Sequence, residues 1–345
     1  MAIYITNPLS DRRWDDLVAC HPRASAFHQR GWIEALTRTY GYEPFVLTTS
    51  SPDKPLNDGI VLCRVSSWIT GTRLVSLPFS DHCEPLLDNL SESLEFLNWL
   101  RAEAGRRRCN YVELRPLYGI DGPACDLRPS QSYYFHELDV RPSLEQIRRG
   151  MHKDSIQRRI DRARREGLTC ETGRSELVGD FYRLLIITRR RHQLLPQPRA
   201  WFTNLVNAMG DKVEIRVART NGTPIAALLT LRHRTTVVYK YGCSDQKFHH
   251  LGGMPLLFWR LIEDSRASGA EKIDFGRSDL DNDGLVVFKN RLGTVSKTLT
   301  YYRYQNTGRR PAHSRRNSHR IRQLFSVLPD PVFSAAGRLL YRHMG

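Results

Sequence analysis

The sequence predicts an α+β protein of two domains followed by a basic tail. The chain has 345 residues, the length of two ordinary domains, and its hydrophobic and charged fractions of 40% and 26% are typical of globular proteins. Helical and strand patterns follow each other in a mixed order, and Asn221-Gly222 between two apolar runs indicates an antiparallel hairpin. We therefore expect domains at 1–141 and 142–307 and a tail at 308–345.

The first half is predicted to hold three helices and five strands. Leu94, Leu97 and Leu100 form an apolar stripe, with Ser91 as a cap and Gly105 as a stop. The helices are expected at 10–20, 29–40 and 91–105, and the strands at 45–49, 59–65, 73–76, 111–114 and 133–140. The domain seam is expected at 139–143, because Pro142 interrupts a strand and Ser143 can cap a new helix.

The second half repeats this logic with helices on either side of a hairpin-linked sheet. A basic helical segment is expected first, at 151–168. Further helices are expected at 177–193, 198–209 and 255–268, and strands at 213–218, 225–231, 236–241, 273–275 and 297–304. The two halves could be a divergent duplication, which the sequence alone leaves open.

The composition bounds the partners and the compartment. A formal charge of +16 indicates an anionic partner, whether nucleic acid, a phosphate-bearing substrate or a membrane surface. The seven cysteines are scattered and include no C-x-x-C pair, so we expect a reducing compartment, no disulfide framework and no metal. No signal peptide and no long apolar run are visible, so a cytoplasmic location is expected.

One segment carries more chemical information than the rest. Ile273-Asp274-Phe275-Gly276-Arg277-Ser278 stops at a glycine, and after a polar loop the apolar run 284–288 ends in Lys289. Glycine permits a left-handed backbone or a close approach, and a lysine beside such a bend can stabilise negative charge during acyl transfer. The same pattern also fits a plain turn, an edge strand and a solvated lysine.

Three other motifs occur in order with this one: Ala26 to Trp32, Met151 to Ala163, and Leu251-Gly252-Gly253-Met254-Pro255. Together the four resemble the FemABX-like transferases, which have tandem acetyltransferase-like (GNAT) domains, over about residues 26–304. The segment 77–83 looks most like the branch found with exopolysaccharide and exosortase systems. The resemblance implies acyl or aminoacyl transfer from a donor co-substrate, aminoacyl-tRNA or acyl-CoA, with no tightly bound cofactor.

The resemblance also implies roles for particular residues. Lys289 would stabilise the oxyanion and Arg277 would fix an anionic part of a substrate. Substrate contacts are expected further at Gly276, Ser278, Phe288 and Trp32. FemX-type enzymes have a lysine after the Phe-x-Gln-x-x-Trp motif that contacts nucleotide-sugar phosphates; Ala35 and Leu36 follow Trp32 here. This departure argues against a muropeptide-precursor substrate.

The loop Phe79-Ser80-Asp81-His82-Cys83 gathers groups that exchange protons or bind polar ligands. We interpret it as a wall of the substrate groove, with His82 as the candidate general base and Asp81 as a substrate contact. A thiol nucleophile at Cys83 would need a lowered pKa.

Phosphate contacts are predicted at two places. In the basic segment, Ile156, Ile160 and Ala163 share one helix face while Arg158 lies opposite, so Lys153 and Arg158 either contact phosphates, as of tRNA, or form a solvated face. Gly252 and Gly253 precede a helix whose N-terminus could hold phosphate. His249-His250-Leu251-Gly252-Gly253-Met254 lacks the first and last residues of the usual CoA loop, so a CoA donor is disfavoured.

The tail from Gly308 is rich in arginine and holds one acidic residue, Asp330. Its apolar residues at 321–328 and 332–341 either dock on the protein or lie on an anionic membrane surface. The sequence thus predicts an acyltransferase acting on an amine or sugar acceptor, in cell-envelope or polysaccharide assembly and peripheral at the inner membrane. A CoA-dependent N-acetyltransferase and a non-catalytic basic module for nucleic acid or membrane are the alternatives.

Overall fold

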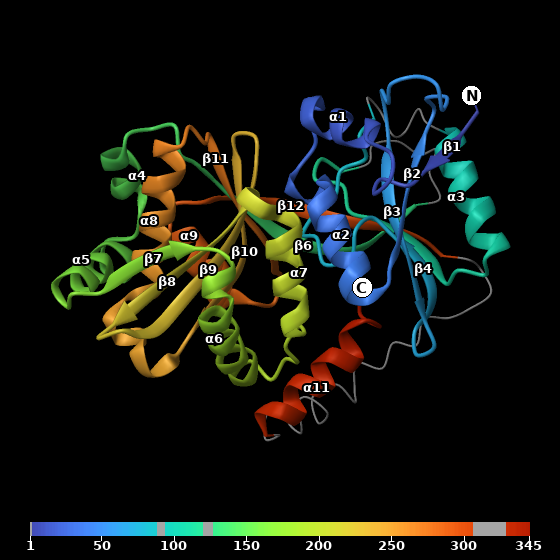
Figure 1. Ribbon diagram of the computed structural model, residues 1–345. Helices are drawn as coiled ribbons and strands as arrows, with labels where there is room; N and C mark the ends of the chain where they lie inside the picture. Colours follow the sequence, from blue (N-terminus) through green and yellow to red (C-terminus); the bar gives the residue numbers. More distant parts are fainter. Residues whose placement is uncertain (1, 88–93, 120–126, 306–328) are drawn as a thin grey trace. The chain divides into compact units, whose positions relative to one another are not determined.

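The computed structural model describes residues 2–87, 94–119, 127–305 and 329–345, which fall into two compact units (Figure 1). Of these residues, unit 1 contains 2–133, 298–305 and 339–345, and unit 2 contains 134–297 and 329–338. The chain therefore passes from one unit to the other within the strands β6 (Arg128–Asp139) and β12 (Val295–Gln305). The compact units divide at Tyr133 and Tyr134, inside β6, whereas the sequence places the seam at 139–143; the strand shows no break in its pattern where the units divide.

Unit 1 is a mixed sheet with helices on both faces. Within this unit the strand order is β1-β2-β3-β4-β5-β12. Leu47 and Leu74 pack with α3, whereas Val46 and Gly59 lie beside Trp14 of α1 on the other face. Its elements are β1 (Tyr4–Thr6), α1 (Arg13–Cys20), η1 (Ala26–His28), α2 (Arg30–Tyr40), β2 (Glu43–Thr48), β3 (Ile60–Ser67), β4 (Gly71–Val75), α3 (Leu94–Arg106) and β5 (Tyr111–Leu114).

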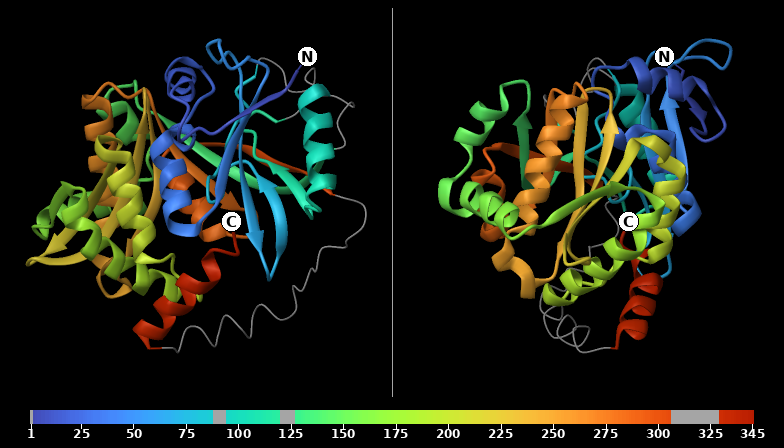
Figure 2. Two further views of the ribbon diagram at one scale, coloured as in Figure 1. Left: turned by 45° about the vertical axis from the view of Figure 1, so that its right-hand side comes forward. Right: turned by 60° about the vertical axis from the view of Figure 1, so that its left-hand side comes forward.

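Unit 2 has the same kind of sheet, in the order β6-β11-β10-β9-β8-β7. Helices α6 and α7 cover one face and α8 the other, as Figure 2 shows from two sides. Its elements are α4 (Leu144–Gly150), the π-helical turn η2 (Lys153–Gln157), α5 (Arg158–Arg165), β7 (Thr169–Gly173), η3 (Ser175–Leu177), α6 (Val178–Arg191), α7 (Arg199–Met209), η4 (Gly210–Lys212), β8 (Val213–Thr220), β9 (Thr223–His233), β10 (Thr236–Ser244), η5 (Gln246–Leu251), α8 (Gly253–Ala267), β11 (Lys272–Asp279) and α9 (Asp283–Arg291).

Local sequence signals set several of these boundaries. Ser143 accepts a hydrogen bond from the N–H of Gln146 and forms the predicted cap of α4. Asn221 and Gly222 both have positive φ, 47° and 74°, and join β8 to β9 as the hairpin signal predicted. The buried residues Ile156, Ile160 and Ala163 share one face of the basic helix, also as predicted.

Two expectations about elements need correction. The apolar run that ends in Lys289, read as a possible edge strand, is helix α9, because the Asn282 side chain accepts from the N–H of Leu285 and starts a helix there. The strands β1 and β7 were not predicted; they are short and only half-buried, so they lack a clear alternation. Ser91, the predicted cap of α3, lies outside the described residues.

The end of the chain forms helix α11 (Asp330–Tyr341). Phe333 is fully buried, with the Arg190 guanidinium 4.8 Å above its ring. Within unit 1, the Arg73 side chain donates to the backbone oxygens of His343 and Gly345. Docking on the protein is thus observed for this part of the predicted tail, and the arginine-rich segment 306–328 lies outside the described residues. No helix in the described ranges is long and apolar enough to cross a bilayer.

Candidate functional site

The fork between β10 and β11 is the central feature of unit 2. These two parallel strands pair at Thr236–Val238 with Lys272–Asp274, and within the two strands, which are both described in full, the pairing ends there. Just beyond that point Gly276 has φ of +67°, a left-handed conformation that favours glycine. The backbone of β11 therefore bends where the two strands part.

Lys289 of α9 holds this bend from inside the protein. Its side chain is 2% exposed, and its Nζ donates to the backbone oxygens of Gly276 at 3.2 Å and Arg277 at 3.0 Å. The N–H of Gly276 in turn donates to Asp274 Oδ1 at 2.6 Å. An ammonium group has three N–H donors, so two of them are given to the bend. The structure thus fixes a positive charge at the fork, buried and held by two carbonyls.

Aromatic and polar groups surround the bend. Phe288 packs on Phe258 at 5.6 Å between ring centroids, and Phe258 stacks on Phe275 at 5.4 Å. Arg277 is half-buried, and Ser278 is 2% exposed. Among the described residues, no hydrogen-bond partner is found for Ser278 Oγ. The structure therefore places five of the predicted site residues close together: Gly276, Arg277, Ser278, Phe288 and Lys289.

His136 of β6 lies beside this group and was not predicted from the sequence. Its side chain is fully buried, and its Nδ1 lies 3.4 Å from Thr294 Oγ1. Burial, and then the charge of Lys289, lower the pKa of His136 to about 4. The imidazole is therefore neutral at pH 7. No sequence signal marks it, because His136 and Lys289 are far apart in the chain.

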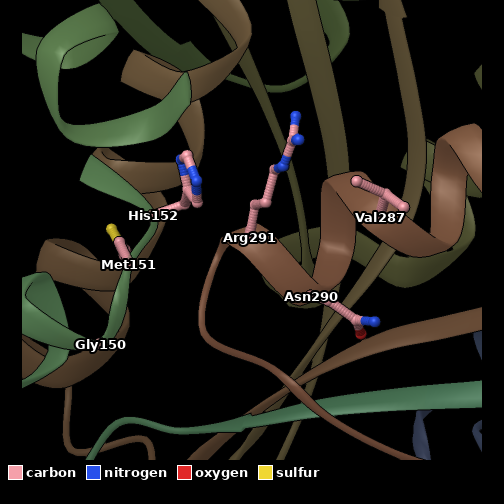
Figure 3. A pocket seen from close by; sticks show the side chains of 6 residues that line it. All are labelled: Gly150, Met151, His152, Val287, Asn290 and Arg291. Carbon is pink, nitrogen blue, oxygen red and sulfur yellow. The ribbon is translucent and has the colours of Figure 1, made fainter. Parts of the chain in front are cut away.

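A basic pocket of about 330 Å³ borders helix α9 (Figure 3). The side chains of His152 and Arg291 extend in similar directions beside it, and the N–H of His152 donates to the Arg291 oxygen at 2.8 Å. His152 also caps the basic helix by accepting from Ser155. The pocket is lined by Gly150, Met151, His152, Val287, Asn290 and Arg291. The pocket suits an anionic group, because His152 and Arg291 are basic and because the N-terminus of the helix that His152 caps is the positive end of its dipole.

The predicted phosphate residues divide into two sets. Lys153 and Arg158 are exposed in the first turns of this helix, and Arg158 pairs with Asp154 at 2.8 Å. Gly252, with φ of +80°, packs closely on helix α5: a Cβ there would lie 2.5 Å from the Arg159 oxygen. A Cβ on Gly253 would lie 3.2 Å from Ile225. Close packing therefore accounts for both glycines without a ligand.

The predicted residues of unit 1 form a separate, buried group. Trp32 is fully buried and meets Phe27 edge-on at 5.0 Å, and His82, 4% exposed, meets the same ring at 5.3 Å. The Asp81 backbone oxygen accepts from Tyr301 Oη at 2.6 Å. Burial raises the pKa of the Cys83 thiol well above its usual value, which is the opposite of what a nucleophile needs. Within the described residues, no cluster of His, Cys, Asp and Glu fits a metal ion.

Comparison with known proteins identifies the fold. Residues 150–284 match the acetyltransferase (GNAT) domain family. The structure of FemX is similar over 89% of this chain and 98% of its own, with a TM-score of 0.68 and 15% identity. A tandem GNAT protein from the clavulanic acid biosynthesis pathway covers 88% of this chain and 98% of its own, with a TM-score of 0.55 and 12% identity.

A third similar structure is the C-terminal domain of a protein named as a lysylphosphatidylglycerol synthetase from Agrobacterium fabrum. It covers 86% of this chain and 91% of its own, with a TM-score of 0.55 and 17% identity. No curated protein matches the chain by sequence. The predicted fold, two tandem GNAT-like domains, is confirmed, and so is the enzyme class, an acyltransferase.

Proposed function

We propose that this protein transfers an aminoacyl or acyl group to an amine or sugar acceptor in cell-envelope or exopolysaccharide assembly. The observation that carries the proposal is the buried Lys289 ammonium, held at the Gly276 bend where β10 and β11 part. Two structural neighbours support it: FemX shares the name of the family that the four motifs resemble, and the other is the C-terminal domain of a protein named as a lysylphosphatidylglycerol synthetase. The exopolysaccharide setting rests on the resemblance of the segment 77–83.

The chemistry requires little beyond alignment and charge stabilisation. The acceptor nitrogen or oxygen attacks the carbonyl carbon of the donor, the carbonyl oxygen becomes negative, and Lys289 stabilises that oxyanion. The attack forms the new amide or ester bond. The acyl–oxygen or acyl–sulfur bond to the donor then breaks, and the proton of the acceptor passes to the leaving group. A preorganised cation of this kind contributes most when it is rigid, which its two carbonyl partners ensure.

The surroundings of helix α8 favour aminoacyl-tRNA over acyl-CoA as the donor. Pro255 in the first turn of α8 has no N–H, and the N–H of Gly252 donates to the His249 oxygen, so few backbone donors remain for a pyrophosphate. The basic pocket at His152 and Arg291, with Lys153 and Arg158 nearby in sequence, offers a surface for a polyanion. We further propose a cytoplasmic enzyme, peripheral at the inner membrane.

Replacement of Lys289 tests the proposal. A deletion strain is complemented with the wild-type gene, with Lys289→Ala or with Lys289→Gln, and its polysaccharide, lipids and small molecules are compared by mass spectrometry. We expect the aminoacylated or acylated product to be absent from the deletion strain and from the strain complemented with Lys289→Ala. The rate of transfer by the Lys289→Ala protein should be lower than that of the wild type by about 10²–10³-fold. Lys272→Ala is the control: Lys272 is a half-buried lysine at the start of β11, the strand that carries the Gly276 bend, and it lies away from Lys289 of α9.

Three outcomes would contradict the proposal. Full product formation by a folded Lys289→Ala protein would show that this cation has no part in transfer. If Lys289→Ala restores the wild-type phenotype of the deletion strain while variants of Lys153 and Arg158 do not, the protein is a non-catalytic module for nucleic acid or membrane. Micromolar binding of acetyl-CoA in a calorimetric titration would instead favour a CoA-dependent N-acetyltransferase.

A further inference from the structure

A second cavity of unit 2, of about 400 Å³, lies at the C-terminal end of helix α8. Its lining includes six charged residues: Asp211, Lys212, Glu214, Arg216, Arg232 and Asp264. Helix α8 has 15 residues, so its two ends are roughly 20 Å apart, and Gly252 marks the opposite end. Neither Lys289 nor Gly276 lines this cavity, so it is distinct from the proposed transfer site.

The floor of the cavity is polar where an apolar core is expected. Ala218, Ala226 and Leu228 of β8 and β9 pack in the core with α8. Arg216 lies two residues from Ala218 on β8, and Thr230 lies two residues from Leu228 on β9. Alternate residues of a strand share one face of the sheet, so both face α8, and they are only 4% and 2% exposed. Burying a guanidinium is unfavourable unless its charge is compensated, so this substitution of polar for apolar residues needs a reason.

The guanidinium of Arg216 is compensated by carboxylates at the mouth of the cavity. Its Nη2 pairs with Glu214 at 2.7 Å, and its Nε donates to Asp264 Oδ2 at 3.1 Å. Its Nη1 donates to Thr230 Oγ1 at 3.2 Å. Glu214 and Asp264 are each about half exposed, at 47% and 49%. The floor and the mouth are therefore joined by one charged network that reaches solvent.

Ser265 supplies an independent sign of a ligand. It lies on α8, lines the cavity and is 3% exposed. Within the described part of the chain, its Oγ has no hydrogen-bond partner. A buried hydroxyl without a partner is unfavourable, and a molecule in the cavity would supply the missing bond.

The charges of the lining define the kind of molecule. Three acidic residues, Asp211, Glu214 and Asp264, are matched by three basic ones, Lys212, Arg216 and Arg232. A balanced set of this kind disfavours a ligand with charge of one sign and suits one that carries both signs at a short separation. The negative end of the α8 dipole also faces this side of the helix and favours an ammonium group.

We propose that this cavity binds a small zwitterion, a free α-amino acid, independently of the transfer site. Its carboxylate would lie toward Lys212 and Arg232 and its ammonium toward Asp211 and Glu214, with Ser265 Oγ as a further partner. Binding there makes no use of Lys289, so the proposal stands or falls separately from the proposed function.

The test uses the full chain and two variants. The twenty standard amino acids are screened by thermal shift, and positive ones are measured by calorimetric titration. We expect at least one to bind with a dissociation constant of about 1 mM or tighter. Ser265→Ala should weaken it by about 3–10-fold, one lost hydrogen bond, and Lys212→Met at the exposed rim should weaken it similarly. Product formation in the complemented strain should be unchanged in both.

Charge-deleted analogues complete the test. The N-acetylated form of the best amino acid and its decarboxylated amine each lack one charge, and both are expected to fail. If no amino acid binds, if the two analogues bind as well as the parent, or if Ser265→Ala binds with unchanged affinity, the proposal is overturned.

Discussion

The two units share an order of elements, and in each unit two parallel strands pair over a short stretch and then part. The units differ in which groups bind the backbone where the strands part. In unit 1, β4 and β5 pair in parallel at Arg73–Val75 with Tyr111–Glu113. Beyond the pair, the N–H of Arg115 donates to Ser76 Oγ at 2.9 Å, and the N–H of Cys83 donates to the Arg115 oxygen at 2.7 Å. The segment 76–83 therefore takes up the polar backbone groups that the parting strands leave.

In unit 2, two side chains, Lys289 and Asp274, bind the backbone groups that a whole segment binds in unit 1. Lys289 takes up the carbonyls of Gly276 and Arg277, and the Asp274 side chain takes up the N–H of Gly276. In unit 1 the segment 76–83 fills the space beside the parting strands, whereas in unit 2 the buried ammonium group of Lys289 lies there. Under the proposed function, unit 2 would carry the chemistry, and unit 1, with its fork filled by protein, would serve for support.

The supporting network of unit 1 gives the largest expected effect on stability. Glu113 is 2% exposed and pairs with Arg115 at 2.8 Å and Arg303 at 2.5 Å. Burial alone would raise the pKa of Glu113, but the two guanidinium groups hold it below its usual value. Glu113→Ala leaves both cations without their partner and should lower the free energy of unfolding by about 3–5 kcal/mol.

Urea unfolding followed by tryptophan fluorescence measures this loss, and Glu137→Ala is the control. Glu137 is more exposed and lies 3.8 Å from Lys297, so its removal should change stability by less than about 1 kcal/mol. Transfer per folded molecule should survive Glu113→Ala. Loss of transfer from a folded Glu113→Ala protein would break the division between a supporting unit and a chemical one.

The sequence predicted the parts of this picture that depend on local patterns. Glycine at Gly276, the cap at Ser143 and the hairpin at Asn221-Gly222 each work through their own backbone, so their residue types reveal them. The run before Lys289 was ambiguous, because five neighbouring residues, mostly apolar, suit a strand or a helix equally well.

Long-range partners were beyond the reach of these patterns. His136 and Lys289, or Glu113 and Arg303, meet only in the folded chain, and no periodicity encodes which strand lies beside which. The His152 and Arg291 pocket was missed for the same reason. His82 and Trp32 were predicted as site residues from motifs, and their burial around Phe27 was not visible in the sequence.

The next largest expected difference between the units is the pH range over which each loses folding stability on acidification. Burial, and then the charge of Lys289, lower the pKa of His136 from 6.5 to about 4. Between these two pH values the unfolded chain binds a proton that the folded chain refuses, so stability is lost as the pH falls from about 6.5 to 4. The full loss from this histidine is at most about 3 kcal/mol. In unit 1, the stability that Glu113 contributes is lost only below about pH 4.5, its ordinary value.

Unfolding free energies measured at a series of pH values between 7 and 4 test this window. His136→Phe should flatten the slope, and His233→Phe should remove a similar share, since burial also lowers the pKa of His233 to about 4. An unchanged slope in His136→Phe would mean that the pKa of this imidazole is the same in the folded and unfolded protein, so that it is protonated beside Lys289 at the acidic end of the series. The fork of unit 2 would then hold two neighbouring cations.

The smallest expected effect concerns the bend itself. Gly276 has φ of +67°, where an L side chain is strained, so Gly276→Ala should lower the free energy of unfolding by about 1–2 kcal/mol. Gly284 of α9 has open space around it, and Gly284→Ala should be neutral or stabilising by up to about 1 kcal/mol. Because Lys289 binds the carbonyls of the bend, a shift of that backbone also moves the cation, and Gly276→Ala should reduce product formation while Gly284→Ala does not. Equal stability and equal product in the two variants would show that the bend tolerates a side chain, and the contrast between a protein-filled fork and a lysine-held one would lose its physical basis.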